Sequence, residues 1–212
     1  MSKRMIQKKR TRQLLLDSAK KLSVSRGFLA ISTAEIAKTA GVAHGTLFAH
    51  FPTRDELIIA ILDNELDIVS DRLYRVIAAE SDFRNTLSAY LDYIASEEDF
   101  FAVICRELPL YDGILRRKIL FRQSTIQERF IEVLQNDIDN NGWTACTASA
   151  VVQMIFGAIN NWLSMKTALA GNDSVVAKIK PLLMRITDEL LHPASCGGVY
   201  PTPVPEMPIA IF

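Results

Sequence analysis

The side chains best suited to chemistry in this sequence lie close together, between residues 33 and 54. His44, Thr46 and His50 stand in one short segment, and Arg54 follows them. Imidazole, hydroxyl and guanidinium groups form hydrogen bonds with base edges and phosphate oxygens, which suits them to nucleic-acid recognition. No set of nucleophile, base and orienting group, no phosphate-binding loop and no metal-ligand cluster can be drawn from the sequence. The residue types therefore favour binding over catalysis, and we expect no enzyme, metal or cofactor.

The charge distribution supports a nucleic-acid partner. Residues 1–54 contain eleven lysines and arginines but only Asp17 and Glu35 as acids, whereas residues 55–212 contain 13 basic and 22 acidic residues. A basic segment joined to an acidic remainder points to nucleic acid on the basic side. A solvated basic surface would give the same counts, so charge alone leaves that alternative open.

Two short helices are expected to present the polar side chains. Ser32 and Glu35 have the spacing of a capping box, which opens a helix over residues 33–40. Gly41 can adopt the left-handed conformation that a tight turn requires, and a second helix follows over residues 43–50. The pattern predicts a helix-turn-helix.

Small and apolar side chains stand where these two helices would cross. Ala37 allows close approach, while Val42 and Leu47 fill the space between the helices. A simple packing hairpin would explain these residues too. It would not require a basic first helix, expected over residues 7–26 and ended by Gly27, so DNA binding is favoured.

The other segments also have helical periodicity, and no run of alternating β-branched residues predicts a strand. A second capping box at Thr53 and Glu56 opens the next helix. The fold class is therefore all-α, with an N-terminal three-helix helix-turn-helix domain and a larger helical bundle. The further helices are expected over residues 53–70 and beyond, 83–95, 98–108, 115–136, 147–170 and 174–191.

Over about residues 14–57 the sequence resembles the tetracycline-repressor (TetR) family of bacterial regulators. The matching residues are Gly27-Phe28, Ile36-Ala37, Ala40-Gly41-Val42, Gly45-Thr46-Leu47-Phe48, His50-Phe51-Pro52, Arg54 and Glu56-Leu57. Beyond them only the architecture agrees. The resemblance implies a homodimeric repressor of about nine helices that binds double-stranded operator DNA and is released by a small-molecule inducer.

The resemblance also implies the DNA contacts. The helix over residues 43–50 would enter the major groove, with His44, Gly45, Thr46 and Ala49 near base edges. The residues that match phosphate-binding positions are Thr33, His50 and Arg54. For His50, simple packing against the neighbouring helix is the alternative.

Three residues depart from the family pattern. Ala43 replaces a capping serine and Phe48 replaces a tyrosine whose hydroxyl reaches phosphate, so these two DNA-facing positions offer fewer fixed contacts. Ser23 stands where the first helix buries a phenylalanine. The first two losses are compensated, we expect, by an N-terminal basic arm that contains Lys3, Arg4, Lys8, Lys9, Arg10 and Arg12.

Dimerisation is expected through the last two helices. Ile159 and Leu163 continue an apolar stripe on the first of them, and Leu182, Ile186 and Leu190 lie on the second. Such stripes can close a four-helix bundle with a second copy. An intramolecular core would show the same periodicity.

An inducer pocket is expected where aromatic and apolar side chains accompany a few polar ones. The candidate lining residues are Phe101, Ile104, Cys105, Leu108, Tyr111, Phe121, Met154, Phe156 and Asn160. Ordinary core packing is the alternative for most of them. A second functional candidate is a DNA-binding protein of the same fold whose C-terminal domain docks a protein instead of a small ligand.

The domain limits are expected at residues 1–52 for DNA binding, 53–192 for ligand binding and dimerisation, and 193–212 for a Pro-rich, flexible tail. Cys105, Cys146 and Cys196 are too few and too far apart for a disulfide framework, and no signal peptide is apparent, so we expect a cytoplasmic protein. Residues 140–165 lack charged side chains, but Gln153, Asn160 and Asn161 argue against a membrane span.

Overall fold

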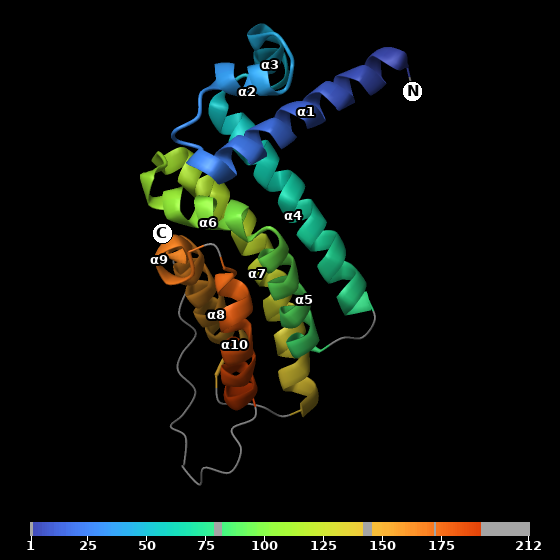
Figure 1. Cartoon of the computed structure of the whole chain (residues 1–212). Coiled ribbons are helices and arrows are strands. Elements are labelled where there is room, and N and C mark those ends of the chain that lie inside the picture. The colour runs from blue at the N-terminus through green and yellow to red at the C-terminus, as the bar shows by residue number, and fades with distance from the viewer. Residues whose placement is uncertain (1, 79–81, 142–145, 172, 192–212) are drawn as a thin grey trace.

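The computed structural model describes residues 2–78, 82–141, 146–171 and 173–191, and these form helices without strands (Figure 1). The all-α expectation is confirmed. The helices are α1 Lys3–Arg26, α2 Thr33–Thr39, α3 His44–His50, α4 Arg54–Ala78, α5 Phe83–Ser96, α6 Glu98–Glu107, the 3-10 helix η1 Leu108–Leu110, α7 Gly113–Asn141, α8 Ala148–Ser164, α9 Lys166–Leu169 and α10 Val175–Leu191.

Helix α1 begins earlier than its apolar pattern predicts. The first fully buried side chain is Leu15, so the first turns contain no periodicity from which a helix could be read. The helix ends as expected at Gly27, whose φ is +87° and whose N–H donates to the carbonyl oxygen of Ser23 at 2.6 Å. A glycine tolerates this positive φ without steric cost.

Helices α1, α2, α3 and the start of α4 form the N-terminal domain. Leu15 and Ala19 of α1 are buried together with Ile36 and Ala37 of α2 and with Leu47 of α3. The apolar sides of all three helices therefore pack together as part of the hydrophobic core, and their polar sides face outward.

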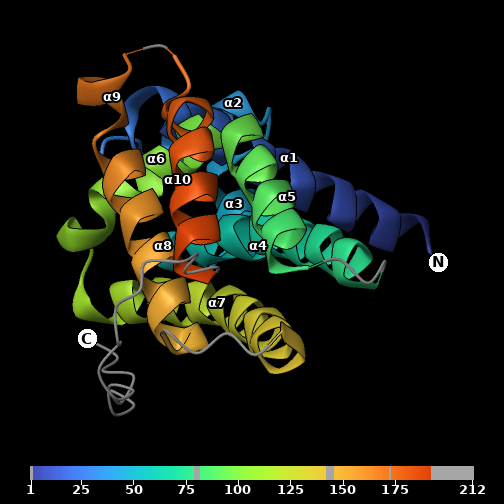
Figure 2. The same cartoon turned by 90° about the horizontal axis from the view of Figure 1, so that it is seen from below.

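The C-terminal helices pack lengthwise around an aromatic core. Figure 2 shows α5, α8 and α10 side by side, with α7 running along one side of the bundle. Phe83, Tyr90, Phe130 and Phe156 form edge-on and tilted ring contacts between these helices, with centroids 5.2–5.9 Å apart. Rings at such distances and angles pack favourably.

The long helix expected over residues 147–170 is divided. Helix α8 ends at Ser164, and Met165, at φ −100° and ψ 9°, separates it from the single turn of α9. Pro181 lies inside α10. The side chain of Pro181 is exposed, so its ring disturbs no buried contact.

The apolar stripe of α8 turns inward, which corrects one expectation. Ile159 and Leu163 are only 1% and 2% exposed because α8 packs mainly against α6 and α7. They are core residues of the single chain, so the expectation that they form a dimer surface is wrong. The exposed apolar residues of α8 and α10 are instead Met154, Leu182 and Ile186.

No described helix is both long enough and apolar enough to cross a membrane. The Pro-rich segment over residues 193–212, together with His192 and Cys196, lies outside the described residues.

Candidate nucleic-acid interface

Helix α2 begins with the capping box that its sequence predicts. The Ser32 hydroxyl accepts from the Glu35 amide at 3.2 Å, and the Glu35 carboxylate accepts from the Ser32 amide at 2.9 Å. The Ser32 amide and then the Arg26 guanidinium lower the pKa of Glu35 to about 2. The carboxylate is therefore ionised at neutral pH and fixes the entry into the helix-turn-helix.

The turn between α2 and α3 has the conformation expected of its glycine. Gly41 has a φ of +68°, and the Val42 amide donates to the Ala37 carbonyl at 3.0 Å. Leu47 is fully buried behind the turn, while Val42 packs partly buried against the same core. These contacts fix the angle between the two helices, so the outer side of α3 has a defined direction.

The outer side of α3 is formed by small and aromatic residues. Ala43, Gly45, Phe48 and Ala49 are exposed, and Thr46 is half-buried. No charged carboxylate lies on this helix. A short, exposed, acid-free helix can approach the edges of base pairs without repulsion from DNA.

His44 is exposed but held in place. Its Nε2 atom lies 2.9 Å from the Thr33 hydroxyl of α2, and its ring meets Phe48 edge-on at 5.0 Å. Because one ring nitrogen is engaged, the orientation of the imidazole is set before any ligand arrives. Thr33 itself is half-buried at the first turn of α2.

His50 closes α3 next to the basic first helix. Burial and the positive charges of Lys8 and Arg12 lower its pKa. The Arg12 guanidinium also stacks over Phe51, 4.6 Å from the ring centroid. Helix α1 therefore places two positive charges beside the end of α3.

Arg54 lies at the first position of α4, and part of its guanidinium faces the chain interior. Its Nη2 atom is buried and has no hydrogen-bond partner among the described residues. The guanidinium lies near Tyr111. Burial and Glu107 raise the pKa of Tyr111, and the charge of Arg54 reduces this rise. The predicted phosphate position thus also adjoins the C-terminal helices.

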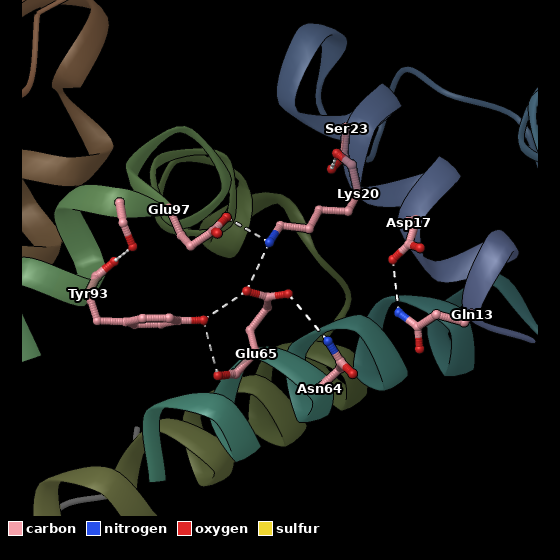
Figure 3. Close-up of polar contacts among 9 residues, drawn as sticks. Gln13, Asp17, Lys20, Ser23, Asn64, Glu65, Tyr93 and Glu97 are labelled. Atoms are coloured by element: carbon pink, nitrogen blue, oxygen red, sulfur yellow. Dashed lines mark hydrogen bonds and ion pairs between the residues drawn. The ribbon is translucent and has the colours of Figure 1, made fainter. Parts of the chain in front are cut away.

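An ion-pair cluster joins α1 to the C-terminal helices (Figure 3). The Lys20 ammonium lies 2.9 Å from the Glu65 carboxylate of α4 and 2.7 Å from that of Glu97, which precedes α6. The Tyr93 hydroxyl of α5 donates to Glu65 at 2.9 Å. Burial alone would lower the pKa of Lys20, but hydrogen bonds to Glu97 and Glu65 outweigh it and raise the pKa.

A second buried carboxylate joins the same two parts of the chain. Glu107 of α6 accepts from the Leu29 amide at 3.3 Å and from the Tyr111 hydroxyl at 2.9 Å. A side chain at Gly27 would collide with this carboxylate. We call the contacts of Lys20 and Glu107 together the interdomain joint, because both connect α1 or the segment after it to later parts of the chain.

Inside the C-terminal bundle, a small polar cluster lies beside the aromatic core. Asn160 of α8 accepts through Oδ1 from the Gln123 amide at 2.9 Å and from the Cys105 thiol at 3.7 Å. Burial raises the pKa of Cys105 to about 12, so the thiol stays neutral at physiological pH. We call Cys105, Gln123 and Asn160 the polar cluster.

The structure brings together only some of the expected pocket residues. Phe101, Ile104 and Phe156 are buried, and Leu108 is half-buried. Tyr111 is buried but hydrogen-bonds to Glu107 in the interdomain joint. Phe121 and Met154 are 59% and 60% exposed and point away from the interior.

Several residues of these sites were absent from the sequence-based predictions. In the sequence, three of them look like ordinary charged residues of helices: Glu65, Glu97 and Glu107. Nothing in their spacing indicates a contact with Lys20 or Leu29. Gln123 also lacks a signal of this kind. Tyr90 could have been found from its place in the apolar pattern of α5.

Comparison with known proteins identifies the N-terminal segment. Residues 15–61 match the family model described as bacterial regulatory proteins, tetR family. This match covers α2, α3 and the adjoining parts of α1 and α4, which are the elements that form the candidate interface.

Solved structures share the whole fold at low sequence identity. A transcriptional regulator FadR from Bacillus subtilis, in complex with stearoyl-CoA, aligns with a TM-score of 0.73 and 20% identity over 85% of this chain and 97% of that one. The fatty acid degradation regulator FadR from Bacillus halodurans aligns with a TM-score of 0.73 and 19% identity over 87% of this chain and 96% of that one. A TetR family transcriptional regulator, PfmR from Thermus thermophilus, aligns with a TM-score of 0.66 and 16% identity over 84% of this chain and 96% of that one.

Proposed function

Because this chain is a transcriptional regulator of the TetR family, we propose that it is a homodimeric repressor that a small molecule releases from its operator. The observation that carries the proposal is that the exposed, acid-free α3 packs with α1 and α2, and that buried charges join α1 and the segment after it to the C-terminal helices. Such a connection lets a change in the bundle alter the position of α3.

In this proposal α3 enters the major groove. His44, Gly45, Thr46 and Ala49 face base edges, while Thr33, His50 and Arg54 contact phosphates beside Ala43 and Phe48. The exposure of His44, Gly45 and Ala49 supports base contacts. The lowered pKa of His50 favours a neutral ring that forms a hydrogen bond instead of an ion pair.

The proposed ligand site lies at the polar cluster. A ligand with an apolar body can displace packing around Phe156 and Tyr90, and a polar group on it can take over the hydrogen bonds of Asn160. Aromatic walls with a few polar anchors are typical of small-molecule pockets. The FadR from Bacillus subtilis was solved with stearoyl-CoA, which makes acyl-CoA thioesters the first ligands to test.

The proposed dimer uses the outer sides of α8 and α10. Met154, Leu182 and Ile186 are exposed there, although most apolar residues of both helices are buried. A second copy would remove these three side chains from water. Two copies related by a two-fold axis would also present two α3 helices to one operator.

DNA binding is tested by selecting duplexes from a randomised library with the full chain. We expect an inverted repeat to be enriched. If a dimer forms about eight phosphate contacts, the logarithm of its affinity falls with the logarithm of salt concentration with a slope of about −7. A slope near zero, or no enriched sequence, would reject the DNA-binding proposal.

Ligand control is tested on the selected duplex with stearoyl-CoA and shorter acyl-CoAs. We expect at least one to weaken DNA binding, and Asn160→Leu to remove the response without changing the affinity of the ligand-free protein. The control is Asn161→Leu, because Asn161 is the exposed neighbour on the same helix. Equal loss of response in both variants would reject the polar cluster as the site.

A second candidate, control by a docked protein, is supported by one surface. Leu110, Ile114 and Phe121 are all exposed at η1 and the start of α7. A run of exposed apolar side chains is typical of interaction sites. If Ile114→Lys with Phe121→Lys abolishes regulation in cells while Asn160→Leu does not, protein docking replaces ligand binding.

A further inference from the structure

The first half of α1 is a largely exposed basic helix. Residues 3–14, which we call the arm, contain no fully buried side chain, and the first buried side chain is that of Leu15. The arm touches the rest of the chain through Arg12, whose guanidinium lies over Phe51. At a rise of about 1.5 Å per residue the arm extends about 18 Å. The family match begins at residue 15, so the arm lies outside it.

Both views show where the arm points. It projects from the body at the end that carries α2 and α3, and it runs away from α8 and α10 (Figures 1 and 2). Lys8 and Arg12 lie close enough to His50 to lower its pKa, and Arg12 stacks over Phe51, so the second half of the arm lies beside the end of α3. A ligand that touches α3 would therefore meet the arm next.

The arm has a high and uncompensated charge. It contains Lys3, Arg4, Lys8, Lys9, Arg10 and Arg12 and no acidic residue. Within the described part of the chain, none of these six forms an ion pair with a carboxylate. The charges occur on all sides of the helix, so they leave no apolar stripe of the kind that holds a helix at a membrane surface.

Repulsion between these charges lowers the stability of the helix that carries them. Arg4 and Lys8, and Lys8 and Arg12, are like-charged pairs four residues apart, which destabilise a helix. Lys3 and Arg4 lie in the first turn, at the positive end of the helix dipole, and Ser2 provides no side-chain cap. A polyanion would relieve both effects.

We propose that the arm binds the phosphate backbone of DNA that flanks the operator half-site, and that this contact further stabilises its helix. The positive charge of the arm complements the phosphate backbone of DNA. If α3 lies in the major groove, an arm that projects beside α3 (Figure 1) reaches DNA outside the base pairs that α3 contacts. The inference rests on the proposed DNA-binding function.

The test compares two triple variants of the full chain. Lys8→Gln, Lys9→Gln and Arg10→Gln remove three charges from the arm. Arg116→Gln, Arg117→Gln and Lys118→Gln remove three exposed charges from α7 and serve as the matched control. Each protein is titrated against the selected duplex with long flanks and with flanks trimmed to the half-sites, at several salt concentrations.

Four results are expected. Trimming weakens binding of the unmodified chain and of the control by tenfold or more, but leaves the arm variant unchanged. The arm variant loses about one unit of salt slope for each phosphate contact removed. Long-flank DNA protects the sites after Lys8, Lys9 and Arg10 from trypsin, and trimmed DNA does not. Far-ultraviolet circular dichroism gains helix with the long duplex.

The outcomes separate this inference from the proposed function. If no duplex is selected at all, the DNA-binding proposal itself fails. If a duplex is bound but trimming affects the arm variant and the unmodified chain equally, the arm does not contact the flank. Trypsin protection of the arm without DNA would show that it docks on the protein, and would also overturn the inference.

Discussion

His44 has two neighbours that limit what its imidazole can do. Its Nε2 atom is engaged by Thr33, and its ring rests on Phe48, so Nδ1 is the atom left to meet a base. Such pre-orientation favours specificity, because less freedom is lost on binding.

We expect His44→Ala to relax the preference at one base pair in each half-site, at a cost of about 1–3 kcal/mol. Thr33→Val, which removes only the hydrogen-bond partner, is expected to have a smaller effect of the same kind. Titrations on the selected duplex and on single-base variants measure both. Equal weakening on all sequences would mean that His44 does not read a base.

Arg54 is expected to act differently, because phosphates are the same in every sequence. Arg54→Ala should weaken all duplexes alike and reduce the salt slope by about one unit per protomer. Because its Nη2 atom is buried near Tyr111, the variant should also be less stable. Salt titrations and thermal melts measure the two effects. A change confined to operator preference would contradict the phosphate assignment.

Lys20 is the residue of α1 that forms ion pairs with Glu65 and Glu97. We expect Lys20→Met to lower the free energy of unfolding by about 2 kcal/mol, because buried Glu65 loses its cation. Lys21→Met is the control, since Lys21 is the exposed neighbour and should cost less than about 0.5 kcal/mol. Urea unfolding measures the difference, and equal values would show that the ion pair contributes nothing.

Helix ends and turns that depend on nearby residues could be predicted from the sequence. The Ser32 and Glu35 capping box, the turn at Gly41 and the end of α1 at Gly27 each depend on neighbours within a few residues, and all three are confirmed. The interdomain joint was not predictable, because Lys20 and Glu97 are far apart in sequence and their charges match many other partners. The inward turn of α8 was missed because periodicity does not tell which side another helix covers.

The whole molecule should lose stability at alkaline pH. Burial raises the pKa of Cys105 to about 12, whereas an unfolded thiol ionises near pH 8.5. The unfolded state therefore releases a proton that the folded state keeps, and stability falls as pH rises above about 8.5. The pKa values of Tyr90, Tyr93 and Tyr111 are also raised, mainly by burial, and should steepen the loss above pH 10.

Cys105→Ala isolates this contribution. Between pH 9 and 10 the unmodified chain should lose about 1.4 kcal/mol per pH unit through this thiol, and the variant should lack that loss. Cys146→Ser, at an exposed position, serves as the control. Urea unfolding at several pH values gives the slopes. An unchanged slope in Cys105→Ala would show that the thiol is accessible in the folded protein.

The assembly should depend on the exposed apolar residues of α8 and α10. Leu182→Glu with Ile186→Glu is expected to give a folded monomer in sedimentation, with operator affinity reduced by two orders of magnitude or more. Leu110→Glu with Ile114→Glu changes two exposed aliphatic residues elsewhere and should stay dimeric. A dimeric Leu182 and Ile186 variant would place the interface on another surface.

The collision that any side chain at Gly27 would have with Glu107 has a consequence for protein engineering. One way to seek a new operator preference is to exchange the N-terminal domain for that of another chain. Here such a graft would carry Gly27 and Lys20 away from Glu107, Glu65 and Glu97, which belong to the recipient part. A working chimera must therefore transplant both halves of the interdomain joint, so the natural unit of exchange is larger than the helix-turn-helix itself.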